Sequence, residues 1–106
     1  MGNDEQILRM LVERIVDHLK PERIYLFGSK ARGDAGPDSD FDLLVVVGSS
    51  SEPGYRRDID AYRAVRDVPM AKDILVWTRD EFDSRLHICA SLPATVVREG
   101  RLLYAA

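Results

Sequence analysis

Two aspartates, Asp40 and Asp42, flank Phe41 at the start of the apolar run FDLLVVV (41–47). Side chains alternate along a β-strand, so both carboxylates are expected on the same face, near the beginning of a strand. Two neighbouring anions repel each other unless a cation lies between them. A hard divalent cation takes carboxylate oxygens readily. The sequence therefore predicts a metal site at Asp40 and Asp42.

A third aspartate, Asp73, opens the apolar run DILVW (73–77). If this run forms a strand beside strand 41–47, the carboxylate of Asp73 completes a cluster with Asp40 and Asp42. Two metal ions held about 3.5–4 Å apart by such a cluster can align an in-line displacement at phosphorus. Asp73 could also help to deprotonate the attacking hydroxyl. The three aspartates are the predicted catalytic and metal-binding residues, and the alternative for Asp73 is an exposed strand start.

A glycine and a serine, Gly28-Ser29, directly follow the apolar run RIYLF (23–27). A glycine lets the backbone approach a ligand closely. The amides that follow it, the Ser29 hydroxyl and the dipole of a helical turn starting there could hold phosphate oxygens. Lys30 and Arg32 lie within reach of the same phosphates, and Arg32 can bind them with two hydrogen bonds. We predict a nucleotide-binding loop from Gly28, Ser29, Lys30 and Arg32, with a solvated loop as the alternative for the two cations.

Two other motifs share some of these letters and are excluded. The stretch GSKARG (28–33) begins like a Walker A loop, but Asp34 stands where that motif requires lysine. The stretch DSDFD (38–42) has the spacing that opens an EF-hand loop. In an EF-hand, glycine is needed where Leu43 stands and glutamate where Ser49 stands.

The hydrophobic pattern predicts the elements that position these residues. We expect helices at 4–19, 55–67 and 94–98, a helix that begins at the capping-box pattern Thr78–Glu81, and strands at 23–27, 41–47, 73–77 and 101–104. This order predicts an α+β fold, a small mixed sheet flanked by helices, with strand 41–47 in its interior and strand 101–104 at an edge. The helix after Thr78 is expected to bury Phe82, Leu86 and Cys89.

Helix 55–67 carries four arginines, which are expected on its solvated face or against an acidic partner: Arg56, Arg57, Arg63 and Arg66. With 106 residues, the chain is expected to form one domain, 1–106. The net charge of -3 argues against broad binding to nucleic acid. The chain contains no apolar run of about 18 residues that could span a membrane. The N-terminus shows no secretory pattern, so a cytoplasmic protein is expected.

The stretch GSKARGDAGPDSDFDLLVVV (28–47) resembles the GSx10DxD signature of the DNA polymerase β-like nucleotidyltransferase superfamily. It is similar to the smallest members, the minimal nucleotidyltransferases, and the resemblance continues to an EG-x-x-LY ending at 99–104. It implies the polymerase β-like fold, ATP as substrate and two Mg²⁺ ions bound by Asp40 and Asp42. Asp73 matches the third carboxylate, and Gly28-Ser29 match the triphosphate-binding loop.

The resemblance also implies a partner. Minimal nucleotidyltransferases are commonly encoded beside HEPN-domain proteins, and the catalytic core uses nearly all of this chain, so a second protein is expected to complete the acceptor site. The implied activity is AMPylation of a tyrosine on a HEPN ribonuclease toxin, with this chain as the antitoxin of a type VII-like module and part of a hetero-oligomer. The alternatives are a non-catalytic module that masks its partner and a subunit of a small-molecule nucleotidyltransferase.

Overall fold

The computed structural model describes residues 2–36 and 39–106, so Pro37 and Asp38, the first position of the excluded EF-hand spacing, lie outside the described residues. Five helices and four strands follow one another along these residues: α1 (Gly2–Leu19), β1 (Arg23–Phe27), α2 (Ser29–Arg32), β2 (Phe41–Val47), α3 (Gly54–Ala64), β3 (Lys72–Thr78), α4 (Arg79–Asp83), α5 (Leu92–Glu99) and β4 (Arg101–Ala105). The predicted bounds of β1 and β2 are confirmed.

The four strands form one mixed sheet in the order β3-β2-β1-β4. β1 pairs antiparallel with both β2 and β4, and β2 pairs parallel with β3. The most apolar strand, β2, is therefore interior, and β4 is an edge strand, as predicted. The mixed sheet with flanking helices confirms the expected fold class.

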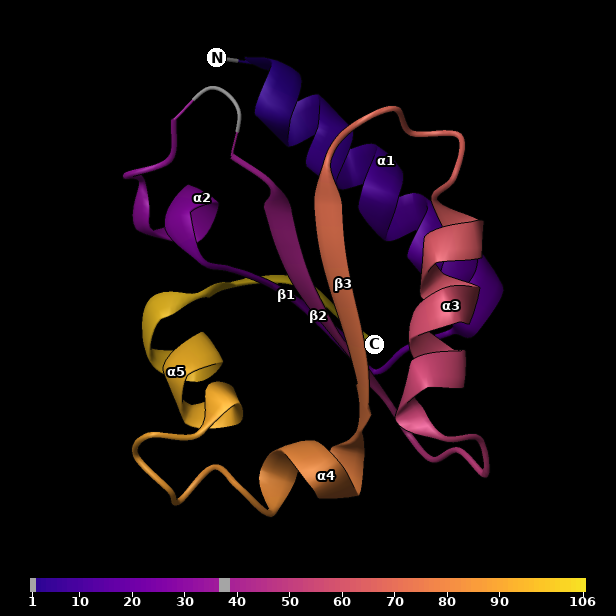
Figure 1. Ribbon diagram of the computed structural model, residues 1–106, viewed down its shortest axis with the longest axis vertical. Coiled ribbons are helices and arrows are strands. Elements are labelled where there is room, and N and C mark those ends of the chain that lie inside the picture. The colour runs from indigo at the N-terminus through magenta and orange to yellow at the C-terminus, as the bar shows by residue number, and fades with distance from the viewer. Residues whose placement is uncertain (1, 37–38) are drawn as a thin grey trace.

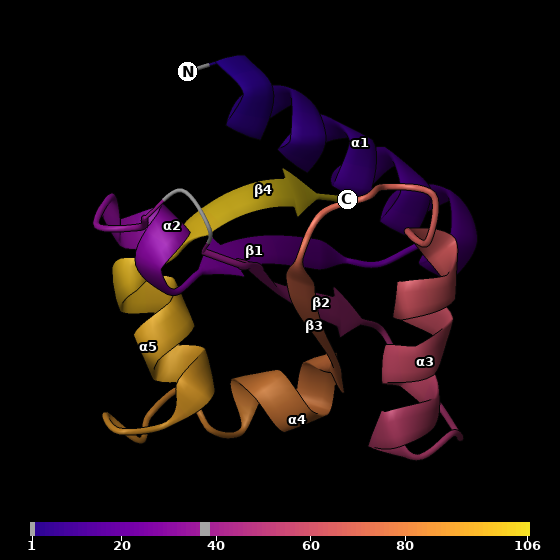
Figure 2. The same cartoon turned by 45° about the horizontal axis from the view of Figure 1, so that its top comes forward.

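Helices cover both faces of the sheet (Figures 1 and 2). On one face, α1 and α3 pack over a core that includes Leu11, Ile15, Leu43, Val65 and Ile74. On the other face, Phe82 of α4 and Val96 of α5 pack against Leu44, Val46 and Tyr25. Odd-numbered positions of β2 enter the first core and even-numbered positions enter the second, because side chains alternate along a strand. No helix within residues 2–36 and 39–106 has the length and apolar character that crossing a membrane requires.

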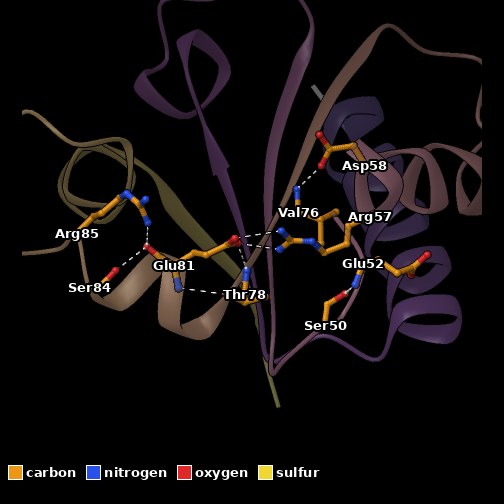
Figure 3. A network of polar contacts seen from close by, with 9 residues as sticks. All are labelled: Ser50, Glu52, Arg57, Asp58, Val76, Thr78, Glu81, Ser84 and Arg85. Atoms are coloured by element: carbon orange, nitrogen blue, oxygen red, sulfur yellow. Dashed lines mark hydrogen bonds and ion pairs between the residues drawn. The ribbon is translucent and has the colours of Figure 1, made fainter. Parts of the chain in front are cut away.

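The outer edge of β3 is closed by side chains, chiefly from α3, which runs beside that strand (Figure 1). Three alternate β3 amides donate to side-chain oxygens: Ile74 to the Tyr62 hydroxyl at 2.9 Å, Val76 to Asp58 at 2.8 Å and Thr78 to Glu81 at 2.8 Å. Figure 3 shows the last two of these bonds. Since an open strand edge invites pairing with another chain, these contacts protect the sheet and fix α3 against it.

The segment after α4 differs from the prediction. The capping box at Thr78 and Glu81 is present, but α4 ends at Asp83, Leu86 is 37% exposed and Cys89 is exposed. The backbone tightens there, since the amides of residues 85, 86 and 88 donate to carbonyls three positions earlier. This loses the 3.6-residue period of a helix, so Leu86 and Cys89 leave the buried side that Phe82 occupies.

Candidate functional site

The parallel pairing of β2 and β3 brings the predicted carboxylates together. Asp42 and Asp73 are direct partners in the register, so their side chains leave the sheet at the same level and on the same face. Asp40 lies just before β2, two positions from Asp42. Asp40 and Asp73 are exposed and Asp42 is partly buried. All three therefore lie at the end of the sheet where β2 and β3 begin.

The negative charges in this cluster act on one another. Burial raises the pKa of Asp42, and the nearby charges of Asp73 and Asp40 raise it further, while Arg32 acts in the opposite direction. A divalent cation between the carboxylates would remove this repulsion, and carboxylate oxygens are the ligands that Mg²⁺ prefers. No three His, Cys, Asp or Glu side chains within the described ranges already converge as a preformed metal site. The aspartates thus fit Mg²⁺ by charge and by ligand chemistry.

The glycine of the predicted phosphate loop directly contacts this cluster. Gly28 has φ +75° and ψ -159°, a conformation that residues with a Cβ rarely adopt. A Cβ at this position would overlap the Oδ2 atom of Asp42. Glycine is therefore required twice, by the backbone conformation and by the closeness of the Asp42 carboxylate. The predicted phosphate loop and Asp42 therefore form one structural unit.

The helical turn after Gly28 leaves backbone donors available. The amides of Ala31 and Arg32 both donate to the Gly28 carbonyl at 3.1 Å. The amides of Ser29 and Lys30, at the start of the turn, donate to no acceptor in the part of the chain that the structure describes. Unpaired amides at the start of a helical turn are suited to bind anions. The expected helical turn at Ser29 is present, as α2.

The two predicted phosphate-binding cations have different surroundings. Lys30 donates to Asp4 of α1 at 3.2 Å, and its ammonium lies 4.5 Å from the centre of the Phe41 ring. Its side chain is only 8% exposed, so binding a phosphate would require Lys30 to leave these partners. Arg32 is 46% exposed and donates to Asp34 at 3.3 Å. Because the charge of Arg32 also acts on Asp42, Arg32 is better placed than Lys30 to bind a phosphate at this site.

Tyr62 of α3 joins the cluster, which the sequence did not predict. Its hydroxyl donates to Asp73 Oδ1 at 3.1 Å and accepts the hydrogen bond from Ile74 of β3. Burial raises the pKa of Tyr62, and the neighbouring Asp73 raises it further. Only the docking of α3 on the β3 edge creates this contact, so no local pattern in the sequence could have indicated it.

Arg57 is a second departure from the sequence analysis. The residue is 8% exposed, so it does not belong to the solvated face of α3. Its guanidinium donates to both carboxylate oxygens of Glu81, at 2.8 and 3.1 Å (Figure 3). Glu81 also accepts the Thr78 amide, so this ion pair connects α3 to the far end of β3. It lies at the opposite end of that strand from Asp73.

A cleft of about 820 Å³ opens beside α1 and α3, away from the carboxylates. None of the predicted site residues lines it. Two of its arginines are already paired, Arg14 with Asp67 at 3.0 Å and Arg57 with Glu81 at 2.8 Å. The cleft has no cluster comparable to the three aspartates, so its size alone does not make it the site of chemistry.

Comparison with protein families identifies the class of protein. The family described as "Nucleotidyltransferase domain" matches residues 8–102, a range that contains every predicted site residue. The chain therefore belongs to the nucleotidyltransferase domain family. A search among curated proteins finds no match.

Solved structures agree with this assignment. A protein from Sulfolobus solfataricus that is assigned as a nucleotidyltransferase is 25% identical, with a TM-score of 0.66 over 94% of this chain and 81% of that one. A toxin–antitoxin complex with AMP-PNP has the same TM-score at 22% identity, covering 93% of this chain and 73% of the other. A mutant of the toxin–antitoxin complex MntA-HpeT has a TM-score of 0.63 at 17% identity, with the same coverage. The last two, at this identity, show the fold alone.

Proposed function

We propose that this protein is a Mg²⁺-dependent nucleotidyltransferase that transfers AMP from ATP to a tyrosine hydroxyl of a partner HEPN ribonuclease toxin, and that it acts as the antitoxin. The observation that carries the proposal is the register of Asp42 with Asp73, together with the contact of Gly28 with Asp42. The loop that would bind phosphate thus lies beside Asp42 and its neighbouring carboxylates. Membership of the nucleotidyltransferase family and the toxin–antitoxin neighbours support the same reading.

The chain's own groups have separate tasks in this proposal. The free amides of Ser29 and Lys30, with the Ser29 hydroxyl, bind the triphosphate, and Arg32 adds positive charge. Asp40, Asp42 and Asp73 would hold the Mg²⁺ ions. When bound, these ions supply charge compensation for the phosphates and the leaving group. Lys30 contributes its side chain only if it is released from Asp4.

The covalent step is an in-line displacement. The acceptor oxygen forms a bond to the α-phosphorus of ATP, the bond from that phosphorus to the bridging oxygen breaks, and pyrophosphate leaves with the bonding electrons. Asp73 accepts the proton of the acceptor hydroxyl. The hydrogen bond from Tyr62 orients the Asp73 carboxylate for this task.

The test identifies the proposed HEPN-domain partner from the reading frames beside this chain, co-expresses it with this chain and purifies it. Intact-mass spectrometry of that partner should show the added mass of at least one adenylate with the wild type and none with Asp42→Asn. A partner that is inhibited but unmodified would instead establish masking without catalysis. An equal adenylate adduct with Asp42→Asn would exclude the carboxylate cluster as the catalytic site.

A further inference from the structure

One side of α3 points away from the core and carries an unusual set of side chains. Six residues form this surface, which is named the α3 outer face from here on: Tyr55, Arg56, Ile59, Tyr62, Arg63 and Arg66. Tyr55 is 65% exposed, Ile59 44% and Tyr62 38%, and the three arginines are also exposed. These are large exposed apolar and aromatic groups on a helix whose opposite side packs in the core.

The spacing explains why these side chains share one side. Tyr55, Ile59 and Tyr62 follow one another at intervals of four and three, so they lie in a row along the helix. Arg66 continues this row just past the end of α3. Arg56 and Arg63 are seven positions apart, two helical turns, and both lie along one side of the row. The buried residues of α3 lie opposite, so nothing in the core accounts for this row.

The α3 outer face carries three arginines on a chain whose net charge is -3. Two of them, Arg63 and Arg66, also line the cleft beside α1, where the exposed Asp60 and Asp67 lie next to them. None of the three arginines lies within 4.0 Å of a carboxylate in residues 2–36 and 39–106, whereas Arg14, Arg23 and Arg101 elsewhere do. Tyrosine and arginine are the residue types enriched at the energetic centres of protein interfaces. Apolar side chains bordered on one side by arginines that have no carboxylate partner among the described residues match a partner surface that is apolar with an acidic margin.

The surface continues into the candidate site. Tyr62 belongs to the α3 outer face, and its hydroxyl donates to Asp73. α3 runs beside β3 (Figure 1), and its Tyr62 contacts Asp73, so the C-terminal part of this helix lies next to the carboxylates. We propose that the α3 outer face docks an acidic surface of the protein substrate and thereby delivers its acceptor hydroxyl to Asp42 and Asp73. This inference rests on the proposed function.

A second copy of this chain is a poorer occupant of the same surface. In a two-fold symmetric contact each patch meets itself, so arginines would face arginines. Like charges brought together across an interface are unfavourable. Single-stranded RNA could also meet arginines and tyrosines, because bases stack on aromatic rings. RNA binding is therefore one of the outcomes that the test distinguishes.

The test identifies the proposed HEPN-domain partner from the reading frames beside this chain, purifies both proteins and titrates their binding by calorimetry. The triple variant Arg56→Glu/Arg63→Glu/Arg66→Glu should bind at least about tenfold more weakly than the wild type. The matched control Arg9→Glu/Lys20→Glu/Arg98→Glu makes the same change in charge at exposed cations elsewhere, and should bind within about twofold of the wild type. The apolar variant Tyr55→Ser/Ile59→Ser should also weaken binding, which provides a second test if the triple variant folds poorly.

The outcomes separate this inference from the proposed function. Loss of binding in the α3 variants alone supports the docking surface, even if no AMP is transferred to the bound partner. Unchanged binding by both α3 variants overturns it, even if AMP transfer persists. It is also overturned if the control weakens binding equally, if the wild type does not bind the HEPN protein, or if α3 variants abolish dimer formation or single-stranded RNA binding instead.

Discussion

Replacing Gly28 by alanine tests the contact between the phosphate loop and the carboxylates. At φ +75° and ψ -159° a residue with a Cβ is strained by about 1–3 kcal/mol. The new Cβ would also overlap Asp42 Oδ2, so the Asp42 side chain must leave its position, at about 0.5–1.5 kcal/mol for an off-rotamer conformation. Gly28→Ala should therefore lower the free energy of unfolding by about 2–4 kcal/mol.

A matched control exists five positions later. Gly33 also has positive φ, +83°, but a Cβ there meets no atom of the described residues within 4 Å. Gly33→Ala should lower the free energy of unfolding by only about 1–2 kcal/mol, the cost of the left-handed conformation. Both values can be measured by urea unfolding followed by circular dichroism. The difference between the variants reports the extra strain at Gly28 and its overlap with Asp42.

Gly28→Ala and Gly33→Ala should also differ in their affinity for nucleotide. Titration with a fluorescent ATP analogue and Mg²⁺ should give a Kd at least about tenfold higher for Gly28→Ala, about 1.4 kcal/mol, because Asp42 is displaced. Gly33→Ala should stay within about twofold of the wild type, since its Cβ touches nothing. Equal Kd values for both variants would refute the reasoning that Gly28 and Asp42 form one unit.

Three further predictions concern other parts of the fold. Tyr62→Phe removes the hydroxyl that donates to Asp73 and accepts a hydrogen bond from a β3 amide. It should lower the free energy of unfolding in urea by about 1–3 kcal/mol. It should also lower kcat more than it raises KM for ATP, and an unchanged kcat would contradict the positioning role. The pKa of Glu81 is lowered to about 2, first by Arg57, so its stabilisation is complete above about pH 4.5 and is lost as pH falls toward 2. That pKa shift implies about 3 kcal/mol of stabilisation. Solvent screening reduces it to about 1–2 kcal/mol, because the Glu81 side chain is 42% exposed. Glu81→Gln should therefore make the loss of stability in acid smaller by that amount. Cys89 is exposed, so its thiol should react with DTNB in the native protein without denaturant; protection until unfolding would restore the buried reading.

The sequence predicted the elements whose patterns are local. The strands at 23–27 and 41–47 are bounded by a proline-containing turn and a glycine-rich loop. Their short apolar runs therefore predicted strands with these bounds. The parallel placement of β3 beside β2 was a condition of the three-aspartate hypothesis, and the register now pairs Asp42 with Asp73. The roles of these aspartates and of the loop at Gly28-Ser29 stay predictions.

What the sequence could not predict depends on contacts between distant segments. The pattern assigned Arg57 to solvent, yet it is buried because Glu81 of α4 lies opposite it. The burial expected for Leu86 and Cys89 was wrong, because the chain tightens after α4 and leaves the helical period. Lys30 pairs with Asp4 of α1, 26 positions earlier in the sequence. The contacts of Arg57 and Lys30 depend on docking between distant segments, which helical periodicity does not encode, whereas the error at Leu86 and Cys89 has a local cause.

The central claim is nucleotidyl transfer at the aspartate cluster, and labelled ATP tests it most directly. The purified protein is incubated with Mg²⁺, the proposed HEPN-domain partner, and ATP carrying the label at either the α- or the γ-phosphate. The account predicts that α-label becomes covalently attached to the partner, that γ-label is released in pyrophosphate, and that Asp42→Asn abolishes attachment. Attachment of γ-label, absence of any attached label, or undiminished attachment by Asp42→Asn would contradict it.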